Sequence, residues 1–145
     1  MYIYWDAIAT SNLPIEGYIL YMDDGLGGDY SIVYDGRLNP QITSYLVSGL
    51  IPGRTYNFFV RAVDVNGFGD DSTISSFISC VPPSGLALPT LEAVEEEKFT
   101  LAWNLPLSDG GCPITGYVIY SDYGSGGLIN TKVDEALIQN QPYLF

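Results

Sequence analysis

The stretch Leu50–Gly69 reads LIPGRTYNFFVRAVDVNGFG, and it decides what the rest of the chain is built from. Its side chains alternate between two faces, in a pattern rich in aromatic and β-branched residues. Such alternation predicts a half-buried β-strand over about residues 55–64. The Pro52-Gly53 pair in front of it is a turn signal that leads the chain into the strand. One face of this strand carries Tyr56, Phe58, Val60 and Ala62, and the other carries Asn57, Phe59, Arg61 and Val63.

A tyrosine corner is predicted at the start of this strand. Leu50, Pro52 and Tyr56 form the signature Leu-x-Pro-x-x-x-Tyr. In β-sandwiches, a Tyr just after such a corner bonds its hydroxyl back to nearby backbone. The corner and the strand together resemble the E–F corner and the F strand of a fibronectin type III domain. The resemblance implies an all-β, immunoglobulin-like sandwich that serves as a binding or spacing module.

Two segments of the chain resemble each other at a long and nearly constant spacing. The first holds Trp5 and the run Ile15-Glu16-Gly17-Tyr18, and the second holds Trp103 and the run Ile114-Thr115-Gly116-Tyr117. The two Trp residues are 98 positions apart (103 − 5), and the two Tyr residues are 99 apart (117 − 18). A spacing this long indicates a tandem of whole domains and not a solenoid, whose repeats span about 20–50 residues.

We therefore expect two fibronectin type III-like domains, over residues 1–80 and 81–145. The segment Val81-Pro82-Pro83-Ser84-Gly85 marks the boundary, because prolines have no amide hydrogen to give to a sheet ladder. In the nomenclature of this fold, the first domain is expected to have strands B at 2–8, C at 17–22, C′ at 30–34, E at 44–48, F at 55–64 and G at 72–80, with the F–G loop at 66–70. The second is expected to have A at 86–93, B at 99–103, C at 116–120, C′ at 129–133 and the approach to E at 138–145, with a turn at 95–97.

The predicted first domain lacks strand A, and the predicted second domain lacks strands F and G. A sandwich without F would expose apolar faces and open strand edges. We therefore expect the sequence to be a window of a longer repeat protein; the alternative is that neighbouring subunits supply the missing strands. The residues expected in the two cores are Trp5, Tyr18, Leu20, Phe58, Val60, Trp103, Tyr117 and Ile119, whereas Tyr2, Tyr4, Tyr21, Tyr34, Tyr120 and Tyr123 are expected to face outward.

The composition limits the classes of partner. The 145 residues carry 17 acidic and five basic side chains, a formal net charge of −12, and no His. Nucleic acids need clustered Lys and Arg to neutralise their phosphates, so we expect no nucleic-acid partner. No apolar run approaches the roughly 18 residues of a transmembrane helix, so we expect no membrane insertion. The expected partners are proteins, either neighbouring repeats or further copies of the chain.

The residue types argue against catalysis. Without His there is no Ser-His-Asp or Cys-His pair, and two cysteines cannot build a structural zinc site alone. The glycine-rich turns at 25–28 and 124–127 have no following helix to hold a phosphate. No cofactor is expected, and the acidic turns are interpreted as solvated surface. Calcium binding is the alternative, with Asp70, Asp71 and Asp109 approaching one another as oxygen ligands.

Cys80 and Cys112 are predicted to form a disulfide. In the fold that the resemblance implies, Cys80 ends strand G, and Cys112 lies in the B–C loop of the second domain, at the end where strand A enters. Chain-entropy estimates give such a bridge about 3–4 kcal/mol of stabilisation. The bridge would also indicate an oxidising, extracellular compartment. The alternative is two separate thiols, one buried and one exposed.

The resemblance implies a non-catalytic structural or spacer repeat of an extracellular or cell-surface protein, such as a fibre or adhesion component. Two other functions stay open. One is a recognition module that binds a protein or glycan through its B–C and F–G loops, and the other is an accessory domain of a secreted hydrolase. No Asn-x-Ser/Thr sequon is present, so N-glycosylation is not expected.

Overall fold

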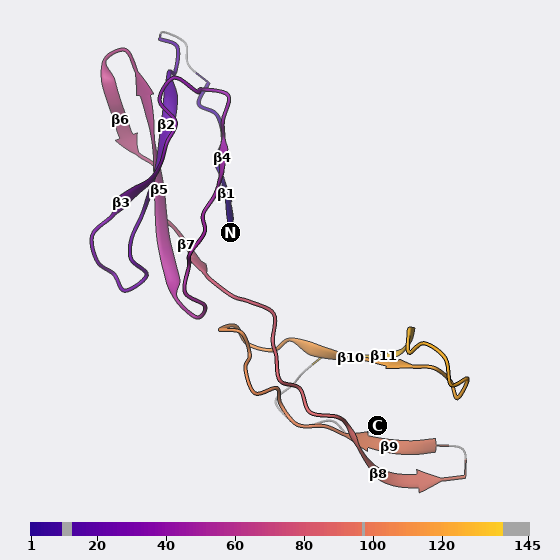
Figure 1. Ribbon diagram of the computed structural model, residues 1–145. Helices are drawn as coiled ribbons and strands as arrows, with labels where there is room; N and C mark the ends of the chain where they lie inside the picture. Colours follow the sequence, from indigo (N-terminus) through magenta and orange to yellow (C-terminus); the bar gives the residue numbers. More distant parts are fainter. Residues whose placement is uncertain (10–12, 97, 138–145) are drawn as a thin grey trace. The chain divides into compact units, whose positions relative to one another are not determined.

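A computed structural model describes residues 1–9, 13–96 and 98–137, which contain eleven β-strands and no helix (Figure 1). The all-β fold class predicted from the sequence is therefore confirmed. The chain divides into two compact units, Met1–Val81 and Pro82–Phe145. The sequence had placed the boundary between residues 80 and 81, next to the same pair of prolines.

The larger sheet of the first unit has the strand order β3-β2-β5-β6, with β7 also paired to β5 (Figure 1). All of its pairings are antiparallel, and the central strand β5 is the one predicted from the alternating stretch. Its register on β2 runs from Gly17↔Val63 to Met22↔Phe58. The strands are β2 (Gly17–Met22), β3 (Ser31–Asp35), β5 (Thr55–Asp64), β6 (Gly67–Asp71) and β7 (Ser75–Ile78).

The smaller sheet pairs β1 (Tyr2–Tyr4) with β4 (Ser44–Leu46), with Ile3 opposite Tyr45. Backbone bonds from Met1 to Val47 and from Trp5 to Thr43 continue this ladder beyond both ends of β1. The two sheets face each other, as strands of a sandwich do, because each strand has one apolar face to bury.

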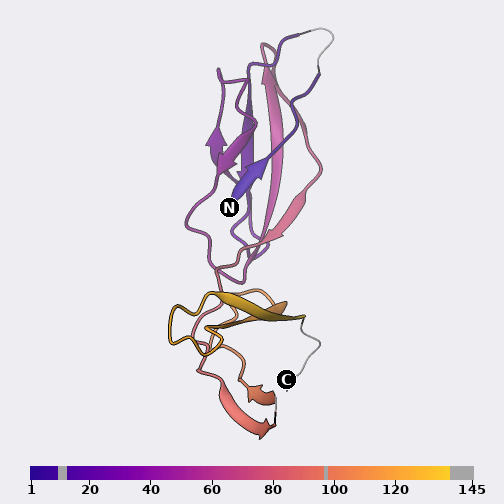
Figure 2. The same ribbon diagram turned by 90° about the vertical axis from the view of Figure 1, so that its right-hand side faces the viewer.

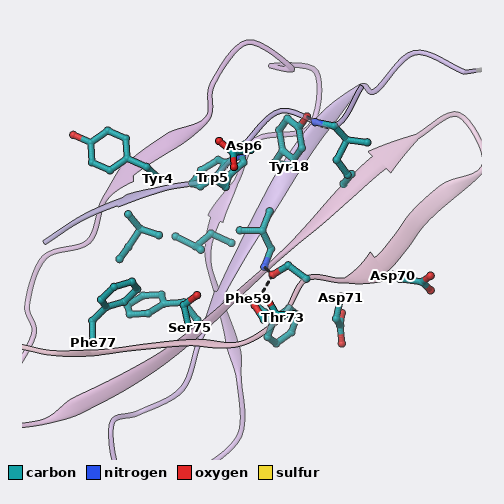
Figure 3. A pocket seen from close by; sticks show the side chains of 17 residues that line it. Tyr4, Trp5, Asp6, Tyr18, Phe59, Asp70, Asp71, Thr73, Ser75 and Phe77 are labelled. Carbon is teal, nitrogen blue, oxygen red and sulfur yellow. Dashed lines mark hydrogen bonds between the residues drawn. The ribbon is translucent and has the colours of Figure 1, made fainter. Parts of the chain in front are cut away.

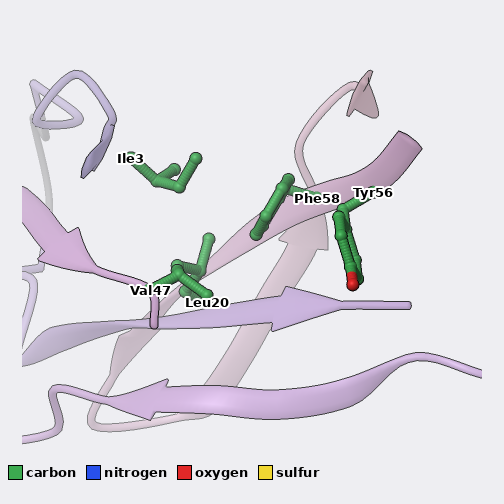
Figure 4. Packing of buried hydrophobic residues seen from close by; sticks show 5 residues of the cluster. All are labelled: Ile3, Leu20, Val47, Tyr56 and Phe58. Carbon is green, nitrogen blue, oxygen red and sulfur yellow. The ribbon is translucent and has the colours of Figure 1, made fainter. Parts of the chain in front are cut away.

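The core of the first unit lies between these sheets (Figure 4). Phe58 and Leu20 are fully buried there, whereas the equally buried Ile19 lies on the opposite face of β2, with Arg61 as its cross-strand neighbour. Tyr18 is also buried, whereas Trp5 and Val60 are half-buried and pack against the cluster. The buried cluster itself consists of Ile3, Leu20, Val47, Tyr56 and Phe58.

The first predicted strand was too long. The structure has β1 at Tyr2–Tyr4 and not at 2–8. Beyond Trp5 the chain leaves β4, and the Ile8 amide donates to the Tyr18 hydroxyl at 3.0 Å. A side-chain contact to the other sheet therefore replaces the strand pairing over the second half of that segment.

The predicted F–G loop was wrong. A two-residue turn joins β5 directly to β6, so most of the segment 66–70 is strand. The Asp64 carboxylate accepts the Asn66 amide at 2.7 Å, and Gly67 takes a φ of 118° that other residues rarely adopt. These two features make the turn tight enough for strand G to begin at once.

One strand G was predicted at 72–80, whereas the structure has two strands, β6 at Gly67–Asp71 and β7 at Ser75–Ile78, with a break at 72–74. At the break, the Ser72 amide donates to the Val60 carbonyl at 2.9 Å, and the Ser72 hydroxyl accepts the Val60 amide at 3.0 Å. A side-chain oxygen thus takes the place of a backbone acceptor, which interrupts the ladder while leaving both groups of Val60 satisfied.

The second unit contains two antiparallel hairpins, coral and orange-yellow in Figure 2. Trp103 is buried and meets the Tyr117 ring edge to face at 5.5 Å, while Tyr117 and Ile119 are half-buried. The hairpins pair β8 (Thr90–Glu95) with β9 (Lys98–Ala102), and β10 (Gly116–Ser121) with β11 (Thr131–Leu137).

Two strands of the second unit differ from expectation at both of their ends. The strand predicted at 86–93 starts only at Thr90, because Ser84 and Gly85 pair with Ser108 and Leu107 instead. The same strand runs to Glu95, where a turn was expected. The strand predicted at 129–133 is β11, which begins at residue 131 and continues to 137. The expected approach to strand E, at 138–145, lies outside the described residues.

Candidate binding groove

A groove of about 500 Å³ opens in the first unit between β1 and β7 (Figure 3). Its floor is apolar, because the alternating positions of β2 and β5 that face the sandwich interior reach it. Along its upper side in Figure 3 lie Tyr4, Trp5, Asp6 and Tyr18, and along its lower side lie Phe77, Ser75, Thr73, Asp71 and Asp70. The floor is formed by Ile3, Leu20, Phe58, Val60 and Ala62. Among the described residues of this unit, none covers the core along this edge.

Trp5 connects the groove to the core. Its ring lies 6.1 Å from that of Tyr18 and 6.0 Å from that of Tyr34, both tilted. The Trp5 Nε1 atom is buried, and among the described residues it has no hydrogen-bond acceptor. A buried donor without a partner costs free energy, so this indole lowers the stability of the core around it.

Two apolar side chains at the mouth of the groove are strongly exposed. Tyr4 is 73 % exposed and Phe77 is 44 % exposed. Ile8, also on the rim, is exposed as well. Exposed apolar groups that adjoin one apolar floor are typical of interaction sites, whereas scattered single ones need no explanation.

The rim of the groove is acidic. Asp6, Asp70 and Asp71 line it. Asp71 forms an ion pair with Arg61, and this hydrogen-bonded partner raises the pKa of the Arg61 guanidinium. The Arg61 and Asp71 side chains are 34 % and 49 % exposed, so the net contribution of this ion pair to stability is small. Asp6 and Asp70 remain as rim charges with no ion-pair partner in the described part of the chain.

An aromatic cluster covers the outer face of the larger sheet, and sequence reasoning missed it. The rings of Tyr21 and Phe59 stack at 4.6 Å, and Tyr30 meets Phe59 edge-on at 4.9 Å. The Arg61 guanidinium lies 5.4 Å from the Tyr21 ring and 5.7 Å from the Phe59 ring. Tyr21 and Phe59 are direct cross-strand neighbours, so only the register of β2 on β5 reveals the contact.

Tyr34 was expected to face outward, and this was wrong. It is half-buried and packs against the core, with its ring stacked on Tyr45 at 4.8 Å. The register between β2 and β3 shifts between Leu20 and Tyr21, which pairs Tyr34 with the inward-facing Leu20. A bulge of this kind changes the face that a side chain occupies, and the alternation alone does not show it.

The predicted corner residues lie where the chain enters β5. The Tyr56 hydroxyl accepts the Ile51 amide at 2.9 Å, and the Tyr56 ring is buried. Leu50 packs against the core cluster, and Pro52 lies exposed in the turn.

Asp23 joins the glycine-rich turn to β5. It is 2 % exposed, and its carboxylate accepts the Asn57 amide at 2.9 Å, the Asn57 side chain at 2.6 Å and the Gly25 amide at 3.1 Å. Burial by itself raises the pKa of Asp23, but these hydrogen bonds outweigh it and hold the pKa below its usual value. Asp24 has its pKa lowered by backbone bonds from Leu26 and Gly28. These carboxylates are occupied in shaping the turn.

No group of three or more Asp, Glu, His or Cys side chains within the described ranges could hold a metal ion. Of the two loops predicted to carry recognition, the F–G connection is a two-residue turn. Residues 10–12 of the B–C loop lie outside the described residues.

Both cysteines of the chain are disulfide-bonded, and neither is free. Cys80 is exposed and Cys112 is half-buried. Within the second unit, Ser84 and Ser108 form an antiparallel bridge through two backbone bonds of 3.0 and 3.1 Å.

The second unit has a smaller cavity of about 170 Å³ beside its Trp. Trp103, Tyr117 and Ile119 line it, together with residues of the segment before β8. The Tyr117 hydroxyl is buried, and no acceptor or donor for it is found in the described ranges.

A protein family and a solved structure are similar to this chain. The sequence profile of the family described as "Fibronectin type III domain" matches residues 1–78. Among solved structures, the FN1–FN3 domains of chicken CNTN1 align with 99 % of this chain and 48 % of that one, at a TM-score of 0.49 and 15 % identity. No helix of the described residues has the length and apolar character that crossing a membrane requires.

Three curated relatives illustrate the range of proteins that contain similar sequence. Fibronectin type-III domain-containing protein 3A of Mus musculus is 29 % identical over 76 % of this chain. The M-protein of striated muscle of Gallus gallus is 32 % identical over 63 %, and usherin of Homo sapiens is 27 % identical over 80 %. The chain spans 9 %, 7 % and 2 % of the length of these relatives, respectively.

Proposed function

Because this chain belongs to the fibronectin type III family, we propose that it is a non-catalytic structural repeat that acts by contact with other proteins. The match of the family over residues 1–78 is the observation that supports this most directly. The relatives are far longer than the chain, which agrees with a repeat that is one part of a larger assembly.

We further propose that the second unit is a repeat of the same kind. Its Trp103 meets Tyr117 as Trp5 meets Tyr18, and the same motif residues lie about one domain length apart. The glycine-rich turns also agree: Asp24 accepts the amides of Leu26 and Gly28, and Asp122 accepts those of Gly124 and Gly126.

An exchange experiment in the full-length protein tests the spacer function. Residues 1–145 are replaced by an unrelated pair of fibronectin type III domains of the same length. A spacer tolerates this exchange, so the adhesion or assembly of the full-length protein should stay intact, while deletion of the same residues impairs it. Loss of function on exchange would contradict the spacer function and support recognition by the surface of this chain.

Recognition is the second candidate, and the groove between β1 and β7 favours it. Its apolar floor, its acidic rim and the exposed Tyr4 and Phe77 form a surface on which a segment of another protein can pack. The exchange experiment separates the two, because a length-matched replacement restores spacing but does not restore a groove.

We propose an extracellular location because the chain contains a disulfide. Cys80 and Cys112 are both oxidised, and disulfides persist in oxidising compartments. The printed names of the relatives include a striated-muscle protein, so family membership alone does not decide the compartment. Alkylation of intact cells before reduction provides the test: the proposal requires both cysteines to stay unalkylated in the native protein.

No cofactor is proposed. A calcium titration followed by melting temperature should show no shift, since Asp71, one of the three carboxylates of the calcium alternative, is already paired with Arg61. A stabilisation that depends on the calcium concentration would reveal a site.

A further inference from the structure

We propose that β3 is a self-association edge, which pairs antiparallel with β3 of a second copy of the chain across a two-fold axis. This rests on the proposed role as a repeat that acts by contact with other proteins, and it names the partner. The larger sheets of the two copies then join into one continuous sheet through backbone hydrogen bonds.

The outer side of β3 has no partner among the described residues. The strand order β3-β2-β5-β6 leaves β3 paired with β2 alone. The Gly36 amide donates to the Tyr18 carbonyl on β2, and Tyr34 lies opposite Leu20 on the same strand. Because alternate residues of an antiparallel strand bond to the same neighbour, Asp35 directs its amide and carbonyl away from β2. The strand lies in the middle of the first unit, so this edge does not depend on where the chain begins.

The β3 edge has few of the features that prevent edge-to-edge pairing. Charged side chains, prolines and bulges serve that purpose in natural sheets. Residues 30–34 read YSIVY, without a charge or a proline. The opposite edge strand of the same sheet, β6, ends in Asp70 and Asp71. Of these two edges, the one formed by β3 is therefore the less protected.

Apolar side chains next to this edge are exposed. Ile32 is 52 % exposed and Tyr30 is 36 % exposed. Ile32 is the cross-strand neighbour of Tyr21, and Tyr30 meets Phe59 edge-on, so both adjoin the aromatic cluster on the outer face of the sheet. A second β3 would place its own side chains beside Ile32 and Tyr30 and remove part of this surface from water.

Symmetry and charge favour a second copy as the occupant. Two identical antiparallel strands are related by a two-fold axis, so the edge is complementary to itself. The chain has a net charge of −12, but residues 30–34 bring no like charges together. Antiparallel pairing also places the two copies of Asp35 at opposite ends of the paired strands, and each is already paired with Arg37 of its own chain.

We expect this pairing to be weak. The strand β3 has five residues, and its register on β2 shifts at a bulge, which shortens the regular stretch open to a second strand. Such a contact buries far less than the roughly 1,600 Å² of a standard interface, so its dissociation constant should be about 0.1–1 mM. An assembly that presents several such edges at once would gain avidity.

Sedimentation equilibrium of the chain of residues 1–145, from micromolar to millimolar concentration, tests the proposal. We expect a reversible dimer and no larger species, because the pairing uses the β3 edge of both copies. Amide exchange in β3 should slow as the protein concentration rises, while exchange in the central strand β5 stays constant. Added salt should strengthen the dimer, since it screens the repulsion between two acidic copies.

Lysine variants locate the contact. Ile32→Lys should weaken the dimer at least about tenfold, because the two-fold axis brings two like charges close together. Ile74→Lys is the matched control, with the same change in net charge at an Ile that is 58 % exposed between β6 and β7. It should leave the dimer unchanged. Protection of the Ile51 amide by Tyr56 shows that each variant stays folded.

A mixture of variants tests the two-fold axis itself. Ile32→Glu alone should weaken the dimer as Ile32→Lys does, for the same reason. An equimolar mixture of the two variants should associate again, because a Lys of one copy then lies near a Glu of the other.

Three outcomes overturn the proposal. The first is a chain that stays monomeric at millimolar concentration. The second is equal weakening by Ile32→Lys and Ile74→Lys, because the association then does not involve the β3 edge. The third is a mixture of the Lys and Glu variants that fails to associate, because the two edges then do not meet across an axis. Each of these leaves the spacer function standing, because the exchange experiment tests that function independently.

Discussion

Two buried side chains, Tyr56 and Asp23, accept hydrogen bonds that hold turns of the first unit in place. The Tyr56 hydroxyl fixes the corner before β5, and the Asp23 carboxylate fixes the glycine-rich turn to the same strand. Both acceptors satisfy backbone amides that the sheet ladders leave free. Each is buried, so water replaces it poorly when it is removed.

Tyr56→Phe should destabilise the first unit by roughly 1 kcal/mol, because the Ile51 amide loses its acceptor while the ring stays packed. Urea unfolding measures the loss as a lower midpoint. Tyr2→Phe is the matched control, since Tyr2 is 60 % exposed and its hydroxyl reaches water. Equal midpoints for the two variants would show that the corner bond contributes nothing.

Acid should destabilise the first unit through Asp23. The folded-state pKa of this carboxyl lies below its usual 3.8, so its contribution is complete above that value and is lost as the pH falls through the lower, folded-state pKa. Asp23→Asn should therefore lower the stability of the first unit at neutral pH. It should also make that stability depend less on pH below about pH 4. Urea midpoints between pH 7 and pH 2 test this, and parallel curves for the two proteins would contradict it.

Close approach between elements explains the Ile-x-Gly-Tyr motif. A Cβ on Gly17 would lie 2.1 Å from the Gly36 carbonyl oxygen, at the end of β3. Next to this contact, the Gly36 amide donates a hydrogen bond to the Tyr18 carbonyl at 2.9 Å. Gly17 is thus needed for the contact between β2 and the end of β3, and not for an unusual backbone angle.

Gly17→Ala should cost about 1–3 kcal/mol, because backbone atoms of Gly36 must move to admit the methyl group. Gly69→Ala is the control: its Cβ would lie 3.4 Å from the Ala62 oxygen, an ordinary contact. We expect the control to change stability by less than about 0.5 kcal/mol. Thermal unfolding of both variants measures the difference, and a neutral Gly17→Ala would refute the close approach.

The disulfide joins two positions that lie far apart in the sequence. Both cysteines are oxidised, and they are 32 positions apart (112 − 80). Closing a loop of this length restricts the unfolded chain, which stabilises the folded state by about 3–4 kcal/mol in chain-entropy estimates. The loop contains the start of the second unit, including β8 and β9.

Cys112→Ser should therefore destabilise the second unit more than the first. Hydrogen exchange should speed up in β8 and β9, while the amides of β5 keep their protection. The double variant with Cys80→Ser should behave like the single one, because one bond is lost in either case. A further loss in the double variant would show that each cysteine has a separate role.

Much of the central sheet could be predicted from the sequence, because local patterns carry it. The alternation around Phe58 predicts β5 to the residue, and the motif around Tyr18 predicts β2 likewise. The tight turn at Asn66 and the break at Ser72 were missed. Both depend on single side-chain hydrogen bonds, which leave no periodic trace.

The sequence by itself determined the all-β class, the two central strands and the exclusion of His-based chemistry, because period-two alternation and residue types are local properties. The tertiary structure alone decided the groove, the aromatic cluster at Tyr21 and Phe59, and the inward position of Tyr34. Each of these depends on strand register or on which edges stay open. Register is set by the balance of contacts across whole sheets, so it emerges only when distant segments pair.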